Sequence, residues 1–282
     1  MSDLYVLSYV HAAPLLVARE AGEVAARTSL DLGLATDEVA LEAGGVVLPD
    51  GQRLPWDAVE EIAGDESVCY ALQDGQVSKV QRFSEVRNLT YVLMPTLRAP
   101  TVLISGIQMH RVKDVDPWQD TLSKVRAVSP VEGRVLDTCT GLGYTAIAAA
   151  EKADQVVTVE VDPNMIEMAR LNPWSRPLFG HPRIRQIMGD SLEEVQAFEE
   201  GSFSRIIHDP PMLARAGDLY SGAFYGYLYR LLARRGRLYH YVGDPESKSG
   251  RNITRGVMRR LQEAGFRRVQ PRPRAFGVVA YK

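Results

Sequence analysis

The sequence predicts an α/β protein in which a mostly parallel sheet follows a smaller β-rich domain. From about residue 119, apolar strand-like runs alternate with helix-like segments, as in parallel α/β sheets. Up to about residue 110, short strand-like runs are separated by turn residues instead. A glycine-containing turn directly follows the first buried run of the second half. We therefore expect two domains, residues 1–110 and residues 111–282.

The N-terminal half carries strong turn signals between short apolar runs. Asp74-Gly75 separates residues 68–72 from 77–80, and an Asp-Gly pair in this setting predicts a β-hairpin. Period-two alternation and apolar runs predict further strands at 29–34, 39–42, 46–48, 89–94 and 101–104. This half shows no catalytic constellation, so substrate capture, homodimer formation and structural support all stay open for it.

The C-terminal half alternates between the two periodicities. Helices are predicted at residues 146–152, 165–171, 191–198, 220–232 and 253–264. Strands are predicted at residues 134–138, 156–160, 183–188, 204–208, 237–241, 267–270 and 277–281. We expect seven strands in one sheet, with the last two forming an antiparallel pair.

Composition excludes several protein classes. The chain has 45% hydrophobic and 24% charged residues, which is ordinary for a globular protein. No apolar run reaches the roughly 18–20 residues that cross a bilayer, and no signal peptide is visible. With Cys69 and Cys139 alone, neither a disulfide scaffold nor a cysteine-rich zinc site can form. We expect a cytoplasmic enzyme with no membrane partner and no metal.

The net charge of −2 is unevenly distributed along the chain. From Arg230 onward, twelve arginines and two lysines oppose three acids, which gives +11 there and −13 before it. A basic C-terminal face would attract an anionic partner, so this segment predicts binding to nucleic acid, RNA more than DNA. The alternative is that the arginines simply form the solvated faces of surface helices.

The first glycine turn has the pattern of a nucleotide-binding loop. Residues 135–143 run from a buried strand through Gly141 and Gly143 into a helix. The absence of Cβ atoms lets the backbone approach a ligand, and the helix N-terminus offers free N–H groups. With Ala146 the stretch also fits a G-x-G-x-x-A dinucleotide fingerprint. A tight turn without any ligand is the alternative.

Acidic residues follow the first three predicted strands of this half. Asp137 and Glu160 end the first two strands, and Asp190 follows the third. A carboxylate at the second strand tip can accept hydrogen bonds from both ribose hydroxyls, and one at the third can reach an adenine amino group. Asp162 could replace Glu160, or could instead cap the next helix ahead of Pro163.

The fourth strand ends in Asp209-Pro210-Pro211. Proline fixes φ and donates no hydrogen bond, so neighbouring carbonyls stay available as rigid acceptors. A carboxylate beside such a carbonyl suits binding of an amino group. His208 and His240 end neighbouring strands at the same edge, and either could remove a proton from an amine or serve only a structural role.

The order Asp-Thr-Cys-Thr-Gly-Leu-Gly, Val-Glu-Val-Asp, Gly-Asp and Asp-Pro-Pro resembles class I methyltransferases over about residues 112–282. The likeness implies a Rossmann-like sheet of seven strands and S-adenosylmethionine as cofactor. Segments at 219–225 and 239–245 are also similar to a predicted, largely archaeal methyltransferase family. The resemblance implies that Asp209 and Pro210 hold the acceptor amine. It implies that the cofactor is held by Asp137, Gly141, Gly143, Glu160 and Asp190.

Two positions depart from that pattern. Cys139 replaces the first glycine of the loop, a change between small residues that binding should tolerate. Met212 replaces the aromatic residue that would stack on a flipped base, which weakens a nucleobase as acceptor. Nearby aromatic residues could supply the ring or belong to the core: Tyr220, Phe224, Tyr225, Tyr227 and Tyr229.

We therefore predict an S-adenosylmethionine-dependent methyltransferase acting on an amino nitrogen, with RNA and DNA among the candidate substrates. Three alternatives remain open. An NAD-dependent oxidoreductase would use the same glycine turn but leaves Asp-Pro-Pro unexplained. A polyamine aminopropyltransferase similarly joins a small N-terminal β domain to this fold, although its Gly-Gly-Gly-Asp loop differs from Cys139-Thr140-Gly141-Leu142. A non-catalytic protein that kept the fold would not need intact acids at the cofactor positions.

Overall fold

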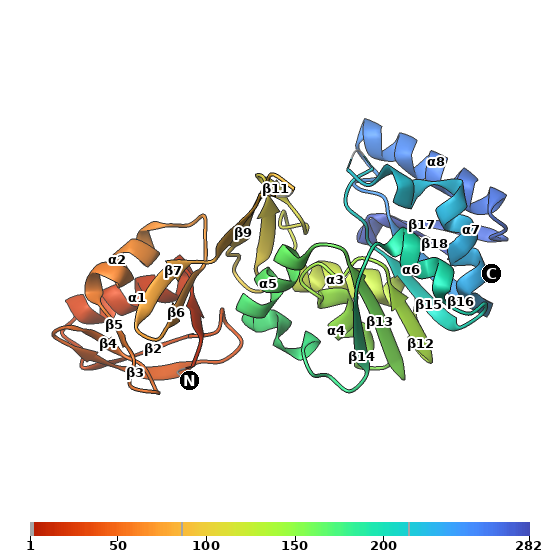
Figure 1. Ribbon diagram of the computed structural model, residues 1–282. Helices are drawn as coiled ribbons and strands as arrows, with labels where there is room; N and C mark the ends of the chain where they lie inside the picture. Colours follow the sequence, from red (N-terminus) through yellow and green to blue (C-terminus); the bar gives the residue numbers. More distant parts are fainter. Residues whose placement is uncertain (1–2, 86, 214) are drawn as a thin grey trace. The chain divides into compact units, whose positions relative to one another are not determined.

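The computed structural model describes residues 3–85, 87–213 and 215–282. Its contacts divide the chain into two compact units (Figure 1). The N-terminal unit comprises Met1–Trp118 and Asn164–Arg176, and the C-terminal unit comprises Gln119–Pro163 and Pro177–Lys282. The first unit thus includes most of helix α5 (Pro163–Leu171) from the second half of the sequence. No helix in the described ranges is long and apolar enough to cross a membrane.

A seven-stranded sheet forms the centre of the C-terminal unit, in the order β14-β13-β12-β15-β16-β18-β17. The first five of these strands are parallel, and β18 is antiparallel to both of its neighbours. This confirms the predicted sheet and its terminal antiparallel pair. The strands are β12 (Arg134–Asp137), β13 (Gln155–Glu160), β14 (Ile184–Met188), β15 (Phe203–His208), β16 (Leu232–Tyr241), β17 (Arg268–Arg272) and β18 (Gly277–Tyr281).

The strand order reverses between β12 and β15, which are hydrogen-bonded neighbours. From β12 the chain proceeds outward to β13 and β14, and then returns to begin the other half at β15. The loops that leave the carboxyl ends of β12 and β15 therefore run in opposite directions. In open α/β sheets this point is the crevice where ligands bind.

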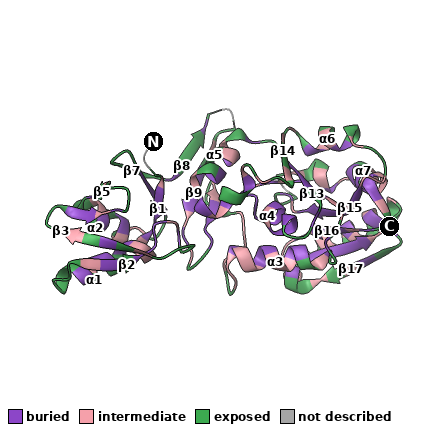
Figure 2. Ribbon diagram, turned by 90° about the horizontal axis from the view of Figure 1, so that it is seen from below, coloured by how far each residue is buried: buried purple, intermediate pink, exposed green. Residues whose placement is uncertain are grey.

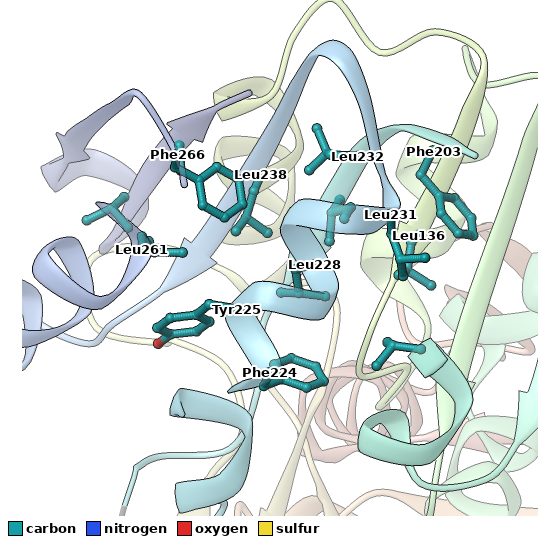
Figure 3. Packing of buried hydrophobic residues seen from close by; sticks show 14 of the residues in the cluster. Leu136, Phe203, Phe224, Tyr225, Leu228, Leu231, Leu232, Leu238, Leu261 and Phe266 are labelled. Atoms are coloured by element: carbon teal, nitrogen blue, oxygen red, sulfur yellow. The ribbon is translucent and has the colours of Figure 1, made fainter. Parts of the chain in front are cut away.

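Three helices cover one face of the sheet: α6 (Ser191–Ala197), α7 (Gly222–Leu231) and α8 (Lys248–Glu263). Figure 3 shows the core beneath them, where Phe224 and Leu228 of α7 pack beside Leu136 and Phe203 of the strands. All four side chains are fully buried. The periodic apolar positions of α7 thus bury one helix face, as predicted from their 3.6-residue spacing.

Helices α3 (Pro117–Ala127) and α4 (Tyr144–Ala150) lie on the opposite side of the strands from α6 and α7 (Figure 2). Buried Arg205 of β15 fixes the segment after α3. Its Nε donates to the carbonyls of Val128 (2.8 Å) and Pro130 (2.7 Å), and its guanidinium pairs with Glu132 at 2.6 Å. These charge-assisted bonds anchor α3 to the sheet.

The N-terminal unit contains three small sheets, of order β1-β6-β7, β2-β3-β4-β5 and β11-β10-β9-β8. Helices α1 (Tyr9–Glu20) and α2 (Trp56–Gly64) pack on each other beside them. The strands are β1 (Tyr5–Leu7), β2 (Ala25–Thr28), β3 (Asp37–Glu42), β4 (Gly45–Val47), β5 (Arg53–Leu54), β6 (Tyr70–Gln73), β7 (Gln76–Lys79), β8 (Gln81–Ser84), β9 (Leu89–Met94), β10 (Thr101–Ile104) and β11 (Ile107–Gln108). The β6–β7 hairpin turns at Asp74 and Gly75, both with positive φ, so the Asp-Gly signal is confirmed.

The strand predicted at residues 29–34 is wrong. Apart from an isolated bridge at Asp31, the segment forms bends and turns. The Ser29 hydroxyl accepts from the Gly33 N–H at 2.7 Å, and the Asp31 carboxylate accepts from Leu34 at 3.0 Å. These local side-chain bonds satisfy the backbone in place of a ladder, which is how serine and aspartate compete with strands.

Leu228→Ala should destabilise the C-terminal unit, because it opens a cavity at the centre of the core. Loss of a fully buried leucine costs about 2–5 kcal/mol of unfolding free energy. Urea unfolding followed by circular dichroism measures the change. Leu97, whose side chain is 84% exposed, provides the matched control. Leu97→Ala should leave the urea concentration at the midpoint of unfolding unchanged. Equal effects of the two changes would contradict this description of the core.

Candidate functional site

The cofactor residues predicted from sequence meet at one edge of the large sheet. Asp137 and Glu160 are the last residues of β12 and β13, and Asp190 is the second residue after β14. Gly141 and Gly143 lie in the turn between β12 and α4. Because these strands are parallel neighbours, their carboxyl ends bring all five residues to the edge that contains the switch point.

Asp137 is fully buried beneath the glycine turn. Its Oδ2 accepts hydrogen bonds from the hydroxyls of Thr145 (3.0 Å) and Thr158 (2.9 Å), whereas Oδ1 is buried and has no hydrogen-bond partner among the described residues. Burial raises the pKa of this carboxyl to about 7, against the two hydroxyls that lower it. Asp137 thus joins the start of α4 to β13 from below the turn.

The glycine turn requires its glycines for two separate reasons. Gly141 and Gly143 adopt φ values of 54° and 79°, in the left-handed region. A Cβ at Gly143 would also lie 2.7 Å from Cδ2 of Leu178. The Gly141 N–H donates to Oε2 of Glu160 at 2.9 Å, so turn and strand tip are hydrogen-bonded to each other.

Glu160 is held in place by backbone donors. Besides Gly141, the N–H groups of Val161 and Asp162 each donate to its Oε1 at 3.0 Å. Burial raises the pKa of Glu160, and these three donors oppose the rise. A carboxylate has about four acceptor positions, so the side chain retains capacity for a ligand hydroxyl. Exposed Asp190 caps α6 by accepting from the Leu192 N–H at 2.8 Å.

An apolar rim surrounds these acids. In the described part of the C-terminal unit, all exposed large hydrophobic residues lie at this edge: Val161, Met188, Met212 and Leu213. Val161 follows β13, Met188 ends β14, and the other two follow β15. Exposed apolar groups gathered at one edge are typical of a surface that a ligand covers. Sequence reasoning missed Val161 and Met188, although Val161 directly follows Glu160 and Met188 lies two residues before Asp190.

Asp209 forms a buried ion pair that sequence reasoning missed. Its carboxylate lies 2.6 Å from Nζ of Lys124, which also lies 3.0 Å from Oδ2 of Asp120 one helical turn earlier. Lys124 is 2% exposed, and its ammonium group sits 4.8 Å from the ring centre of Tyr241. Burial lowers the pKa of Lys124, but the two carboxylates outweigh that effect and raise it. For Asp209 burial raises the pKa and Lys124 opposes the rise.

The rest of the Asp-Pro-Pro turn is fixed by Tyr220. Pro210 is buried, and the Pro211 carbonyl accepts a hydrogen bond from the Tyr220 hydroxyl at 3.1 Å. The Pro211 carbonyl is therefore already engaged in a hydrogen bond within the protein. Of the aromatic residues considered as substitutes for Met212, Phe224 and Tyr225 are fully buried in the core.

His208 has both ring nitrogens engaged. Its Nε2 lies 2.9 Å from the Leu219 carbonyl, which can only accept, so Nε2 carries the proton. Nδ1 then accepts from the Thr138 hydroxyl at 2.7 Å. Burial lowers the pKa of His208 to about 3. This geometry favours a structural role, because no lone pair is free for a substrate proton.

His240 lies beside His208, with ring centres 4.3 Å apart. Its Nε2 is 2.8 Å from the Tyr225 hydroxyl, and the ring is fully buried. Burial lowers the pKa of His240, and the neighbouring imidazole adds to the effect. The structure therefore places two neutral histidines under the edge, and Asp209 is the remaining ionisable side chain among the residues predicted to be catalytic.

Comparisons with known proteins identify relatives of this chain. No protein-family model matches it. It is 44% identical over 236 residues to the uncharacterized protein MJ1233 of Methanocaldococcus jannaschii, covering 83% of this chain and 80% of that one. The chain belongs to the MJ1233 family. This relationship spans most of both proteins, so it includes parts of both units.

Two further likenesses involve polyamine enzymes. The chain is 31% identical over 114 residues to polyamine aminopropyltransferase 2 of Streptomyces coelicolor, covering 38% of this chain and only 21% of that protein. The fold is similar to a crystal structure of spermidine synthase in complex with the transition state analogue AdoDATO. That match has a TM-score of 0.58 and 20% identity, and it covers 71% of each chain.

The prediction of a methyltransferase is wrong in the light of these comparisons. The sequence alignment favours the aminopropyltransferase alternative, which the glycine loop had disfavoured. The four motifs belong to a fold that several reactions share, so they predicted the fold and not the reaction.

Asp137→Asn should change how stability depends on pH. The folded-state pKa of about 7 exceeds the ordinary 3.8, so between these values the folded protein binds more protons than the unfolded chain. Wild-type stability should therefore fall from about pH 4 to about pH 7 through this group and then level off. In thermal melts across this pH range, the melting temperature of Asp137→Asn should fall less steeply with pH than that of the wild type. Exposed Asp218→Asn is the control, and an unchanged slope for Asp137→Asn would contradict the assignment.

Proposed function

We propose that this protein is an aminopropyltransferase, which transfers the aminopropyl group of decarboxylated S-adenosylmethionine to an amine. The proposal depends above all on Asp209, whose carboxylate is held by buried Lys124 at the switch point of the sheet. The alignment with a polyamine aminopropyltransferase supports the choice of reaction. NAD-dependent oxidation receives no such support.

The cofactor end of the site suits an adenosyl group. Glu160 retains an acceptor position for ribose hydroxyls, and exposed Asp190 can accept from an adenine amino group. Val161 and Met188 offer apolar surface between these carboxylates, where a flat base can pack. The turn itself provides no carboxylate of the Gly-Gly-Gly-Asp kind, so Glu160, bonded to Gly141, supplies the nearest one.

The acceptor end suits a cationic amine. In the described ranges, Asp120, Glu160 and Asp209 provide three buried or half-buried carboxyls at this edge, against one ammonium group, that of Lys124. This excess of acid would attract a protonated polyamine and repel a phosphate-bearing acceptor. The expected nucleic-acid acceptor therefore fits this edge less well than an amine does.

The chemistry required of the chain is alignment and proton removal. Bound decarboxylated S-adenosylmethionine would supply a carbon activated by its sulfonium. The acceptor nitrogen must lose a proton before its lone pair can form the new C–N bond as the C–S bond breaks, leaving a neutral thioether. Asp209 can accept that proton, because burial raises its pKa while Lys124 preserves its ionised form. Lys124 also fixes the position of the carboxylate.

Glu160→Gln should weaken binding of the adenosyl ligand, because the amide keeps the size of the side chain but loses its charge. Losing one charge-assisted hydrogen bond costs about 1.5–3 kcal/mol, or about tenfold to a hundredfold in affinity. Titration calorimetry with 5′-methylthioadenosine measures the change, and exposed Glu199→Gln serves as the control. Unchanged affinity in a folded Glu160→Gln protein would show that Glu160 does not contact the ligand.

Asp209→Asn should abolish most of the aminopropyl transfer while sparing cofactor affinity. Loss of a general base typically reduces kcat by a factor of about 100 to 10,000. The assay follows 5′-methylthioadenosine released from decarboxylated S-adenosylmethionine with putrescine, spermidine or longer amines. Asp218→Asn, an exposed acid nearby, should keep full activity. If the wild-type protein releases no product with any amine, the proposed reaction is wrong.

A further inference from the structure

A second candidate binding site lies on the C-terminal unit, away from the acidic edge. It is a cavity of about 840 Å³ bounded by α3, by β16, and by the β17–β18 hairpin with its 3₁₀ turn η3 (Pro273–Ala275). Its volume is typical of small-molecule sites. The residues that line it include Arg126, Arg237, Arg272, Arg274, Ser129 and Tyr281. None of the residues assigned above to cofactor or acceptor lines it.

The topology explains why this surface is open. Residues alternate along β18, so Val278 and Ala280 face the core under α7 and α8 while Tyr281 faces the other way. On that other face α3 ends at Ala127, at the wall of the cavity. On this face Tyr281 of β18 and Arg272 of β17 border the cavity, whereas Val279 is fully buried.

Four arginines from four separate elements converge there, and no carboxylate lines the cavity. In the described ranges, Arg126, Arg237 and Arg272 form no ion pair with an acid. The hydrogen bonds of Arg272 and Arg237 go to neutral acceptors. Arg272 Nη2 donates to the Tyr281 hydroxyl at 3.1 Å and to Gln270 Oε1 at 3.3 Å, and Arg237 donates to the Ser129 carbonyl. The positive charge of this arginine cavity is thus not neutralised by its walls.

Two other arginines of the basic segment, both on α8, do not line the cavity. Arg259 of α8 lies 3.6 Å from Glu263, with both side chains exposed. Half-buried Arg260 donates to the Tyr220 carbonyl at 3.0 Å and so supports the Asp-Pro-Pro side of the other site. Arg259 and Arg260 thus lie outside the arginine cavity, and the arginines of the basic segment that share the cavity are Arg237, Arg272 and Arg274.

We propose that the arginine cavity binds a ligand carrying at least two phosphate groups. Guanidinium groups bind phosphate oxygens in a bidentate manner, and several of them around one cavity suit a polyanion better than a single carboxylate. Tyr281 adds a hydroxyl, and its ring centre lies 5.6 Å from the guanidinium carbon of Arg237 and 5.1 Å from that of Arg268. A free polyphosphate and an RNA backbone share this chemistry. The cavity would repel a polyamine, so this site is additional to the proposed transfer site.

The test uses two probes and the full-length protein. Inorganic tripolyphosphate is titrated by calorimetry, and a short fluorescein-labelled single-stranded RNA by anisotropy at about 50 mM and about 200 mM salt. Arg126→Ala/Arg272→Ala should weaken binding about tenfold or more, since charge-assisted bonds are lost. The matched control Arg255→Ala/Arg259→Ala removes the same charge from the exposed face of α8 and should leave affinity unchanged.

The outcomes separate the two ligand sources. Tripolyphosphate binding without RNA binding supports a free phosphorylated ligand, and mutual competition supports an RNA backbone in the same cavity. The single variant Arg274→Ala changes a different element and should also weaken binding. Its effect would show that the loss in the double variant does not come from misfolding alone. Binding of neither probe, or equal loss in the α8 control, would overturn the proposal. Glu160→Gln should bind both probes normally, and Arg126→Ala/Arg272→Ala should keep transferase activity, so failure of one proposal leaves the other intact.

Discussion

The ion pair between Lys124 and Asp209 is the constraint on which the rest of the site depends. An ammonium group that is 2% exposed is costly to bury alone, and the carboxylates of Asp120 and Asp209 make its burial possible. Breaking such a pair typically costs about 3–5 kcal/mol, because the remaining charge is left uncompensated. The pair therefore fixes where α3 lies against the carboxyl ends of β15 and β16. Arg205 provides the second anchor, through carbonyls just beyond the same helix.

The same pair separates two chemistries on the unit. Towards the switch point, Lys124 supports a carboxylate at an otherwise acidic edge, with the apolar rim beside it. Two and three residues further along α3, Arg126 and Ala127 border a cavity lined by arginines. One short helix thus divides an edge that suits cations from a cavity that suits anions. A cationic ligand would be repelled by the cavity and an anionic ligand by the edge, so we expect no exchange of ligands between the two.

Much of the fold followed from the sequence, because periodicity and turn chemistry act locally. The alternation of strand-like and helix-like segments predicted the sheet of the C-terminal unit, and Asp74-Gly75 predicted the β6–β7 hairpin of the N-terminal unit. Helices α1, α2 and α3 were not predicted, and α3 mattered most. Its apolar positions are few, and its key residues Asp120 and Lys124 resemble an ordinary surface pair at i, i+4 spacing. Only the tertiary contact with Asp209, 85 residues away, buries them. His208 and His240 show the converse, because strand-end histidines suggested catalysis until their hydrogen bonds were known.

The apolar rim also determines how the site would respond to oxidants. Met188 and Met212 expose 52% and 51% of their surface, so their thioethers are open to peroxide, unlike buried Met165 and Met168. Conversion to the sulfoxide adds a strong dipole to a side chain whose contribution is its lack of polarity. Damage would then fall first on the surface expected to contact ligands, while the core beneath it stayed intact. Sulfoxide reduction restores the original side chain, so such inactivation would be reversible.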